Sequence, residues 1–165
     1  MTDVRPAYAL LLLGSNIKPE RHLDAALQLL RACTDLMACS PIYQTPPVAA
    51  PGTADYHNQA VMIRDPLSFE ELRTQLRRIE SELGRIRSAE VNAPRVIDID
   101  ILAGADDSLE MISEWPIDPA LSTLHHAAIP SSTIASAWRF PSSKVNVSEV
   151  ARQLGPIPDG FQKLN

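Results

Sequence analysis

Hydrophobic and polar positions along the first third of the chain predict a strand followed by a helix. A continuous apolar run over 7–13 is typical of a central strand, and the Gly-Ser-Asn run at 14–16 predicts a turn after it. Pro19 suits the first turn of a helix, and apolar residues then recur at helical spacing as far as Cys33.

Two further extended segments lie on either side of an aperiodic loop. Residues 37–43 form the second extended stretch, and residues 58–64 alternate well enough for a third strand. Between them, residues 48–55 are rich in Ala, Pro and Gly and show no periodicity. Because loops held by a rigid scaffold often carry binding groups, this loop is a candidate binding segment.

The clearest local signal is a capped amphipathic helix. Ser68 and Glu71 form a capping box, apolar residues follow at helical spacing as far as Leu83, and Gly84 is placed to end the helix. Strict alternation over 96–102 then predicts a fourth strand.

The predicted order of elements is β, α, β, β, α, β, which is the split βαβ arrangement of ferredoxin-like domains. We therefore expect an α+β fold, an antiparallel sheet with both helices packed on one face, and a C-terminal extension. The part after Ala105 has weak periodicity apart from a short helix predicted near 147–154. A length of 165 residues favours a single domain over 1–165.

Composition narrows the classes of function. A net charge of −5 and a pI near 5.3 argue against a general nucleic-acid or anionic-membrane surface. The sequence shows neither a membrane-length apolar run nor a signal-peptide pattern, so we expect a cytoplasmic protein. We also expect a monomer. Cys33 and Cys39 lack metal-site spacing and are expected to be small buried hydrophobes.

The candidate chemistry centres on Asp98 and Asp100. Carboxylates at positions i and i+2 of a strand point to the same side, with Cα atoms about 6.5–7 Å apart, so both can reach one or two hard cations. Mg²⁺ prefers few protein carboxylates together with waters and phosphate oxygens, so the pair suits a Mg-ATP site. For an isolated pair, the alternative is an ordinary strand with a charged solvent face.

Basic residues lie close to this pair in the sequence. Arg85, Arg87 and Arg95 precede it, and Glu80 lies on the predicted helix. Arginine can pair bidentately with phosphate oxygens while charge develops during phosphate transfer. By composition alone, neutralisation of surface carboxylates explains these arginines equally well.

Several ordered motifs resemble one known family. The run Ala-Pro-Arg-Val-Ile-Asp-Ile-Asp-Ile-Leu at 93–102 is similar to the signature of the 6-hydroxymethyl-7,8-dihydropterin pyrophosphokinases of folate biosynthesis. The resemblance extends to residues 14–16, 43–47, 55–58, 78–80 and 84–87. It implies a ferredoxin-like fold and transfer of the pyrophosphate of ATP to the pterin hydroxymethyl group, with release of AMP and use of two Mg²⁺ ions.

The resemblance also implies roles for single residues. Asp98 and Asp100 would ligate both metals, while Glu80 and Arg95 would lie beside the nucleotide. A mobile loop carrying Arg85 and Arg87 would close over the phosphates. The implied catalytic residues are Arg85, Arg87, Arg95, Asp98 and Asp100.

On the pterin side, the resemblance implies a pocket for a flat heterocycle. Thr45, Pro46 and Val48 would line it, Tyr56 would stack on the ring, and Asn58 would hydrogen-bond the edge of the ring. Taken singly, each of these residues is better explained as a core, turn or loop residue, but in this order they favour binding.

The chain departs from the family pattern near its catalytic loop and after the fourth strand. Asn92 stands where the family usually has Trp, and Ile117 stands where it usually has His. The family's later Arg, which contacts the triphosphate, falls near 123–124, and its Phe, which closes the pterin sandwich, falls near His125 or His126. Either His125 or His126 could replace that Phe as a flat stacking group, and the alternative is that both are surface residues. Of the two, His126 is taken as the candidate substrate-binding residue.

Two functional hypotheses follow. The first is an active pterin pyrophosphokinase that uses ATP and Mg²⁺. The second is a binding protein that keeps the pterin or nucleotide pocket without efficient turnover. An RNA-binding domain of similar topology is disfavoured, because the sheet lacks the paired aromatic residues that stack on bases.

Overall fold

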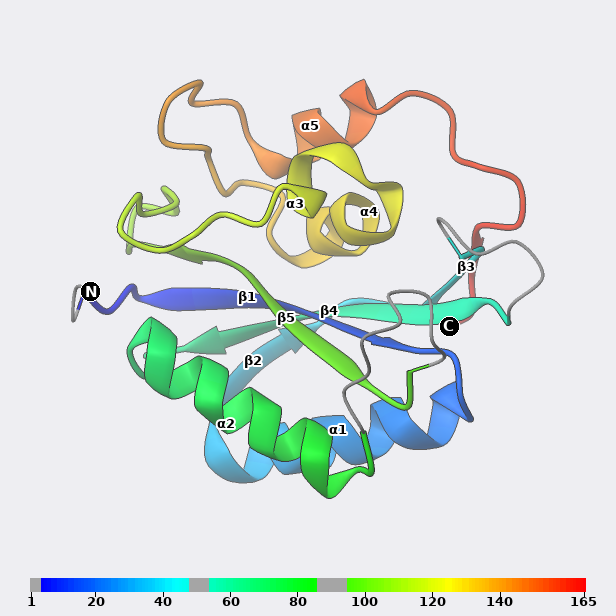
Figure 1. The fold of residues 1–165 in the computed structure, drawn as a ribbon. Helices are drawn as coiled ribbons and strands as arrows, with labels where there is room; N and C mark the ends of the chain where they lie inside the picture. The colour runs from blue at the N-terminus through cyan, green and yellow to red at the C-terminus, as the bar shows by residue number, and fades with distance from the viewer. Residues whose placement is uncertain (1–3, 48–53, 86–94) are drawn as a thin grey trace.

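The computed structural model describes residues 4–47, 54–85 and 95–165. In these residues, strands form one antiparallel sheet in the order β5-β1-β4-β3-β6, and β2 also pairs with β4 (Figure 1). The strands are β1 (Tyr8–Ser15), β2 (Asp35–Cys39), β3 (Tyr43–Thr45), β4 (Tyr56–Arg64), β5 (Asp98–Ala105) and β6 (Gln162–Lys163).

Helices cover both faces of this sheet. Below it in Figure 1 lie α1 (Pro19–Cys33) and α2 (Phe69–Glu82), both on the same face as the sequence predicts. Above it lie α3 (Ala120–Thr123), α4 (His125–Ile134) and α5 (Val147–Gln153). The α+β ferredoxin-like order is therefore confirmed. The part after β5 adds a helical layer for which only α5 has a sequence signal.

The two layers explain the continuous apolar run of β1. Leu11 and Leu13 belong to the core between the sheet and the helices α1 and α2. Leu10 and Leu12 belong to the core between the sheet and the C-terminal helices. Each of these leucines is at most 5% exposed. A strand buried on both faces carries no polar alternation, and each buried leucine contributes about 1.5–3 kcal/mol to the hydrophobic free energy of folding.

The helix α2 begins and ends at the predicted signals. The Ser68 hydroxyl oxygen accepts a hydrogen bond of 3.4 Å from the Glu71 backbone N–H and donates one of 2.7 Å to the Glu71 carboxylate. Gly84 follows the helix with φ at +95°, a left-handed conformation that glycine adopts without strain. These two ends fix the position of Glu80, near the end of the helix, relative to β5.

Several local predictions need correction. β1 continues to Ser15 instead of turning at Gly14, because Gly14 still pairs with strands on both sides. The stretch 37–43 is divided between β2 and β3, both of which pair with β4. Cys33 is exposed because it is the last residue of α1, beyond the buried stripe that ends at Leu30, and Cys39 is only half-buried, so the prediction that both are buried was wrong.

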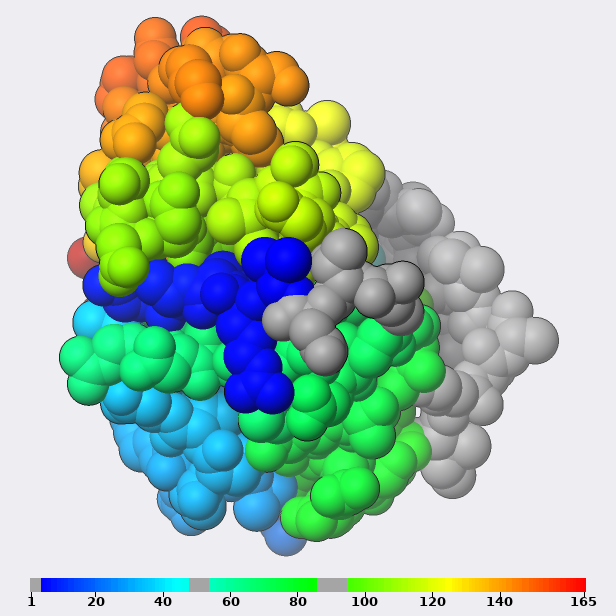
Figure 2. Space-filling view, turned by 90° about the vertical axis from the view of Figure 1, so that its left-hand side faces the viewer, coloured from blue at the N-terminus to red at the C-terminus, as the bar shows by residue number. Residues whose placement is uncertain are grey.

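Trp115 links the two layers at one edge of the sheet. It is 2% exposed, its indole N–H donates to the Val4 carbonyl at 2.9 Å, and its ring packs edge-on against Phe69 with centroids 5.4 Å apart. In Figure 2, the blue residues at the start of β1 lie between the green α2 and the yellow-green residues after β5. Trp115 thus fixes the start of the segment that leads to Asp118.

Within the described residues, no helix is both long enough and apolar enough to cross a lipid bilayer.

Candidate active site

The strand register brings distant residues into one row across the sheet. Gly14 of β1 pairs with Asn58 of β4 on one side and with Asp98 of β5 on the other. A Cβ atom on residue 14 would lie 2.9 Å from the Asn58 amide oxygen and 3.8 Å from the Tyr56 ring. Glycine at this position therefore lets Asn58 and Tyr56 lie close to the backbone of β1.

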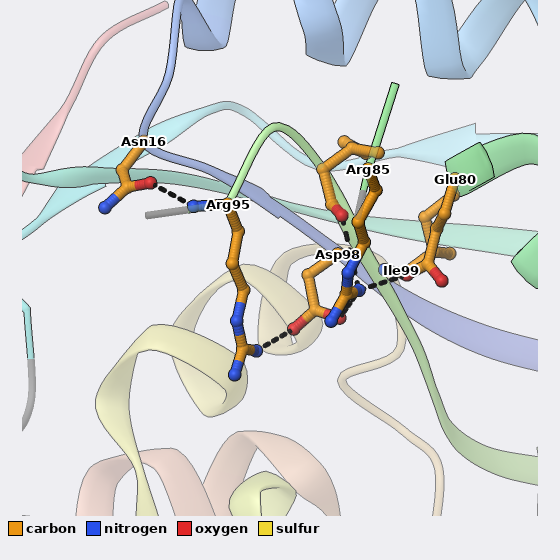
Figure 3. Close-up of polar contacts among 7 residues, drawn as sticks. Asn16, Glu80, Arg85, Arg95, Asp98 and Ile99 are labelled. Carbon is orange, nitrogen blue, oxygen red and sulfur yellow. Dashed lines mark hydrogen bonds and ion pairs between the residues drawn. The ribbon is translucent and has the colours of Figure 1, made fainter. Parts of the chain in front are cut away.

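Two arginines hold the carboxylate of Asp98. Arg85 donates to one carboxylate oxygen at 2.6 Å, and Arg95 donates to the other at 2.8 Å (Figure 3). The side chains of Asp98 and Arg85 are 21% and 10% exposed, so this contact is largely shielded from water. Both oxygens of the first candidate metal ligand are thus already engaged by cations.

Glu80 connects α2 to the start of β5. Its carboxylate accepts hydrogen bonds from Arg85 at 2.6 Å and from the Ile99 backbone N–H at 2.8 Å (Figure 3). Its side chain is only 4% exposed, and a buried carboxylate requires such partners because an unpaired buried charge is costly. Glu80 is therefore a fixed anchor for Arg85.

Asn16 positions Arg95, a contact that sequence reasoning missed. The Arg95 backbone N–H donates to the Asn16 side-chain amide oxygen at 2.8 Å (Figure 3). The Asn16 backbone N–H donates to the Arg95 carbonyl at 3.1 Å. The available signal was the Gly-Ser-Asn run, which carries the resemblance but had no assigned role. The pair ties the residues after β1 to those before β5.

A cavity of about 250 Å³ opens beside β5, the edge strand. Its ionisable lining side chains are Glu80, Asp98, Asp100, Asp118, Arg73 and Arg77. Asp118 and the two arginines are further residues that sequence reasoning missed. A usable signal existed for the arginines, because positions 73 and 77 are one turn apart and share a helix face.

Asp100 is the carboxylate most affected by this crowding. Burial among protein atoms, then repulsion from Asp98, Asp118 and Glu80, raises the pKa of Asp100 to about 7. By surface area Asp100 is exposed to solvent, so repulsion from the neighbouring carboxylates is a stronger cause of the raised pKa than burial. This concentration of carboxylates favours binding of a cation.

The donor set fits magnesium better than a metal bound entirely by protein. Across residues 4–47, 54–85 and 95–165, no three His, Cys, Asp or Glu side chains gather in an arrangement that could hold a metal ion. Mg²⁺ is commonly held by one or two carboxylates together with waters and substrate phosphates, which Asp98 and Asp100 can accommodate.

A second cavity of about 310 Å³ lies beyond the end of β3. Its lining residues are Thr45, Pro46, Pro47, Thr123, Leu124, His125, His126, Pro158 and Phe161. Thr45, Pro46 and His126, three of the predicted pterin-binding residues, are thus brought together. Asn58 contacts a lining residue of this cavity, because its amide N–H donates to the Thr45 hydroxyl at 2.7 Å.

His126, which lines this cavity, has a lowered pKa. Burial holds the pKa of His126 below its ordinary value, and His125 acts in the same direction, whereas Asp118 opposes them. The imidazole is therefore mostly neutral at pH 7, which leaves it as a flat, uncharged ring.

The other predicted positions lie elsewhere. Ile117 packs against the apolar core beneath the C-terminal helices instead of entering either cavity. Val48, Arg87 and Asn92 lie outside the described residues.

Residues 10–137 match the model of the 7,8-dihydro-6-hydroxymethylpterin-pyrophosphokinase (HPPK) family. The chain belongs to the HPPK family. The 2-amino-4-hydroxy-6-hydroxymethyldihydropteridine pyrophosphokinase of Haemophilus influenzae is 30% identical over 151 residues, which cover 88% of this chain and 91% of that protein. The enzyme of the same name from Bacillus subtilis is 38% identical over 105 residues, and the match covers 62% of each protein, less than two thirds of its length.

Solved HPPK structures share the fold. The wild-type HPPK-DHPS of Plasmodium falciparum superposes with a TM-score of 0.72 over 98% of this chain and 49% of that one, at 10% identity. An HPPK-DHPS crystallised in complex with substrates gives a TM-score of 0.73 over 97% of this chain and 46% of that one, at 11% identity. At such identities the likeness shows the fold alone.

Proposed function

We propose that this chain transfers the pyrophosphoryl group of ATP to the hydroxymethyl group of 6-hydroxymethyl-7,8-dihydropterin and releases AMP. The observation that carries the proposal is the convergence of two carboxylates, Asp98 and Asp100, with the guanidinium groups of Arg85 and Arg95 at one end of β5. Membership of the HPPK family supports the choice of substrates.

In this proposal Asp98 and Asp100 hold Mg²⁺, with two ions expected by resemblance to the family. Bound Mg²⁺ would neutralise phosphate charge and orient the transferred group. The raised pKa of Asp100 supports the assignment, because a nearby cation relieves the same repulsion that raises the pKa. Asp118 lines the same cavity and adds negative charge there without being assigned as a ligand.

The arginines provide the contacts to the phosphates. Arg85 and Arg95 donate hydrogen bonds to Asp98, and the same N–H groups would be able to donate to phosphate oxygens if a bound cation took over that carboxylate. Glu80 keeps Arg85 near the site during this exchange. Arg87 is proposed to reach the phosphates as well, on the strength of the family resemblance.

The pterin is proposed to bind in the cavity beyond β3. Thr45, Pro46 and His126 line that cavity, and Asn58 hydrogen-bonds Thr45. Tyr56 and Val48 are assigned to the same site by resemblance. The site then lies at the end of β3 and the start of β4, beside the row that joins Asn58 to Asp98 through Gly14.

A second candidate function is binding without efficient turnover. It is favoured by the segment 115–126, which contains neither arginine nor lysine where the family has a phosphate-binding arginine. Loss of one charge-stabilising contact in a transition state costs about 3–4 kcal/mol, which slows turnover several hundredfold while leaving binding intact.

One experiment separates the two functions. The protein is mixed with Mg-ATP and 6-hydroxymethyl-7,8-dihydropterin, AMP release is followed, and binding of the pterin and of a non-hydrolysable ATP analogue is measured by calorimetry. Turnover that is lost in Asp98→Ala supports the enzyme. Binding of both ligands without AMP supports the second function, and binding of neither contradicts both.

We further propose that residues 1–165 act as one domain, as a monomer in the cytoplasm. The packing of α4 and α5 on the same sheet as α1 and α2 supports the single domain. Sedimentation at working concentration tests the monomer.

A further inference from the structure

The cavity beyond β3 has a wall that comes from the C-terminal end of the chain. Pro158 and Phe161 line it together with Pro46 and residues of the α3–α4 turn. Phe161 is half-buried, and its ring is tilted at 47° to that of Tyr43 with centroids 5.6 Å apart. The contact with Tyr43 leaves the ring of Phe161 supported from one side while it borders the cavity.

This wall is held by backbone pairing. β6 pairs with β3, so that Lys163 lies opposite Tyr43 and Gln162 opposite Gln44. Beyond β6, the Leu164 N–H donates to the Ile42 carbonyl at 2.8 Å. Figure 1 shows the red C-terminal segment running from α5 to the side of β3. Phe161 is therefore fixed relative to the strand that ends at Thr45.

The chemistry of the lining selects a class of ligand. The cavity is lined by Phe161, His125, His126 and three prolines, and neither arginine nor lysine is among the described residues that line it. Its volume of about 310 Å³ lies at the lower end of the range for small-molecule sites. Flat apolar walls without a cation suit an uncharged planar heterocycle better than a phosphate group.

Thr45 gives this cavity a polar edge. Its hydroxyl oxygen accepts the amide N–H of Asn58 at 2.7 Å, which orients the hydroxyl and leaves its own hydrogen available to an acceptor. A planar ring with hydrogen-bonding atoms on its rim matches that combination of flat walls and a polar edge.

We propose that Phe161 forms an aromatic wall of the substrate site, against which the pterin ring packs. The C-terminal segment 158–161 is then part of the substrate pocket as well as an edge of the fold. This inference rests on the proposed pterin substrate and adds a residue that determines affinity for it.

Pterin affinity tests the inference directly. Binding of 6-hydroxymethyl-7,8-dihydropterin is measured by calorimetry with Mg²⁺ and a non-hydrolysable ATP analogue present. Phe161→Ala should weaken pterin binding about tenfold, since it removes an aromatic contact and apolar contact area. Phe161→Trp should stay within about threefold of the wild type, because it keeps an aromatic ring.

Two further variants control for effects on folding. Phe161→Leu keeps an apolar side chain against Tyr43 without a ring, and it should also weaken pterin binding, by about fivefold. Ile157→Ala changes a 58% exposed residue that directly precedes the segment 158–161 and is not among the described residues that line the cavity, and it should leave binding unchanged. The KM for ATP should stay within about twofold of the wild type in the leucine and alanine variants at position 161.

The outcomes are distinct. Wild-type pterin affinity in Phe161→Ala and Phe161→Leu overturns the inference while leaving the proposed function intact, provided that the wild type releases AMP. An equal loss of pterin and ATP affinity in both variants also overturns it, because Phe161 would then act through the fold. A wild type that binds no pterin defeats both the proposed function and this inference.

Discussion

The guanidinium group of Arg85 lies 2.6 Å from a carboxylate oxygen of Asp98, and both side chains are largely shielded from solvent. The other Asp98 oxygen is held by Arg95 at 2.8 Å. A cation that binds Asp98 must therefore displace or share these contacts. In the proposed function, metal binding would be coupled to release of the arginines toward phosphate, because both would depend on the same two oxygens.

Removing the charge of Asp98 should abolish most of the activity. Asp98→Asn keeps the size of the side chain but loses the negative charge, so kcat should fall at least about a hundredfold. AMP release under saturating Mg-ATP measures the effect. Asp35→Asn is the matched control, because Asp35 forms an exposed pair with Arg64 on β2 and β4, and this variant should retain wild-type rates.

Removing Arg85 should destabilise the fold. Arg85→Ala removes the 2.6 Å ion pair with the carboxylate of Glu80, whose side chain is 4% exposed. Such a loss costs about 3–5 kcal/mol and should lower the Tm by about 10 °C.

Arg64→Ala is the control for this effect. It breaks an exposed ion pair and should cost less than about 1 kcal/mol. Thermal unfolding of both variants, followed by circular dichroism, checks the difference. A melting temperature of Arg85→Ala close to that of Arg64→Ala would show that the Glu80 contact contributes little.

Asp100 should make the metal-free protein less stable at higher pH. Its pKa in the folded state, about 7, lies above its ordinary value of 3.8, so folding favours the protonated form. The stability that this proton provides is complete below the ordinary pKa and is lost as the pH rises through 7. Asp100→Asn should therefore raise the Tm in EDTA by about 3 °C at a pH near 8 and have little effect near pH 4. A Tm difference that does not change with pH would contradict this explanation.

Arg77 should contribute to nucleotide affinity. It lines the cavity beside β5, whereas its neighbour Arg78 does not. Arg77→Ala should raise the KM for ATP about tenfold, as expected for loss of one charge-assisted contact, and leave the KM for pterin unchanged. Arg78→Ala removes the same charge from an adjacent exposed position and should behave as the wild type. Equal effects of the two substitutions would indicate only a general loss of positive charge.

The first part of the fold could be predicted because its signals are local. The apolar run of β1 and the capping box at Ser68 each report on a few adjacent residues, and both give the correct element. The strand alternation around Asp98 and Asp100 likewise places both carboxylates on one side of β5, although β5 begins at Asp98 itself.

The rest depends on contacts between distant segments. Asp118 and Asp98 line the same cavity because the chain after Trp115 folds back over the sheet. Phe161 reaches the wall beside Pro46 through the pairing of β6 with β3, a strand of two residues that has no recognisable periodicity. Because periodicity after Ala105 is weak, the sequence did not predict the second helical layer or the cavity-lining residues of this part of the chain.

The identity of the nucleotide product distinguishes pyrophosphoryl transfer from transfer of a single phosphoryl group. Purified protein is incubated with Mg-ATP and 6-hydroxymethyl-7,8-dihydropterin, and nucleotides and pterins are separated and quantified together. We expect AMP and a pterin carrying a diphosphate to form in equal amounts, with neither formed by Asp98→Asn. Formation of ADP in place of AMP, or equal AMP release by the wild type and Asp98→Asn, would contradict pyrophosphoryl transfer at this site.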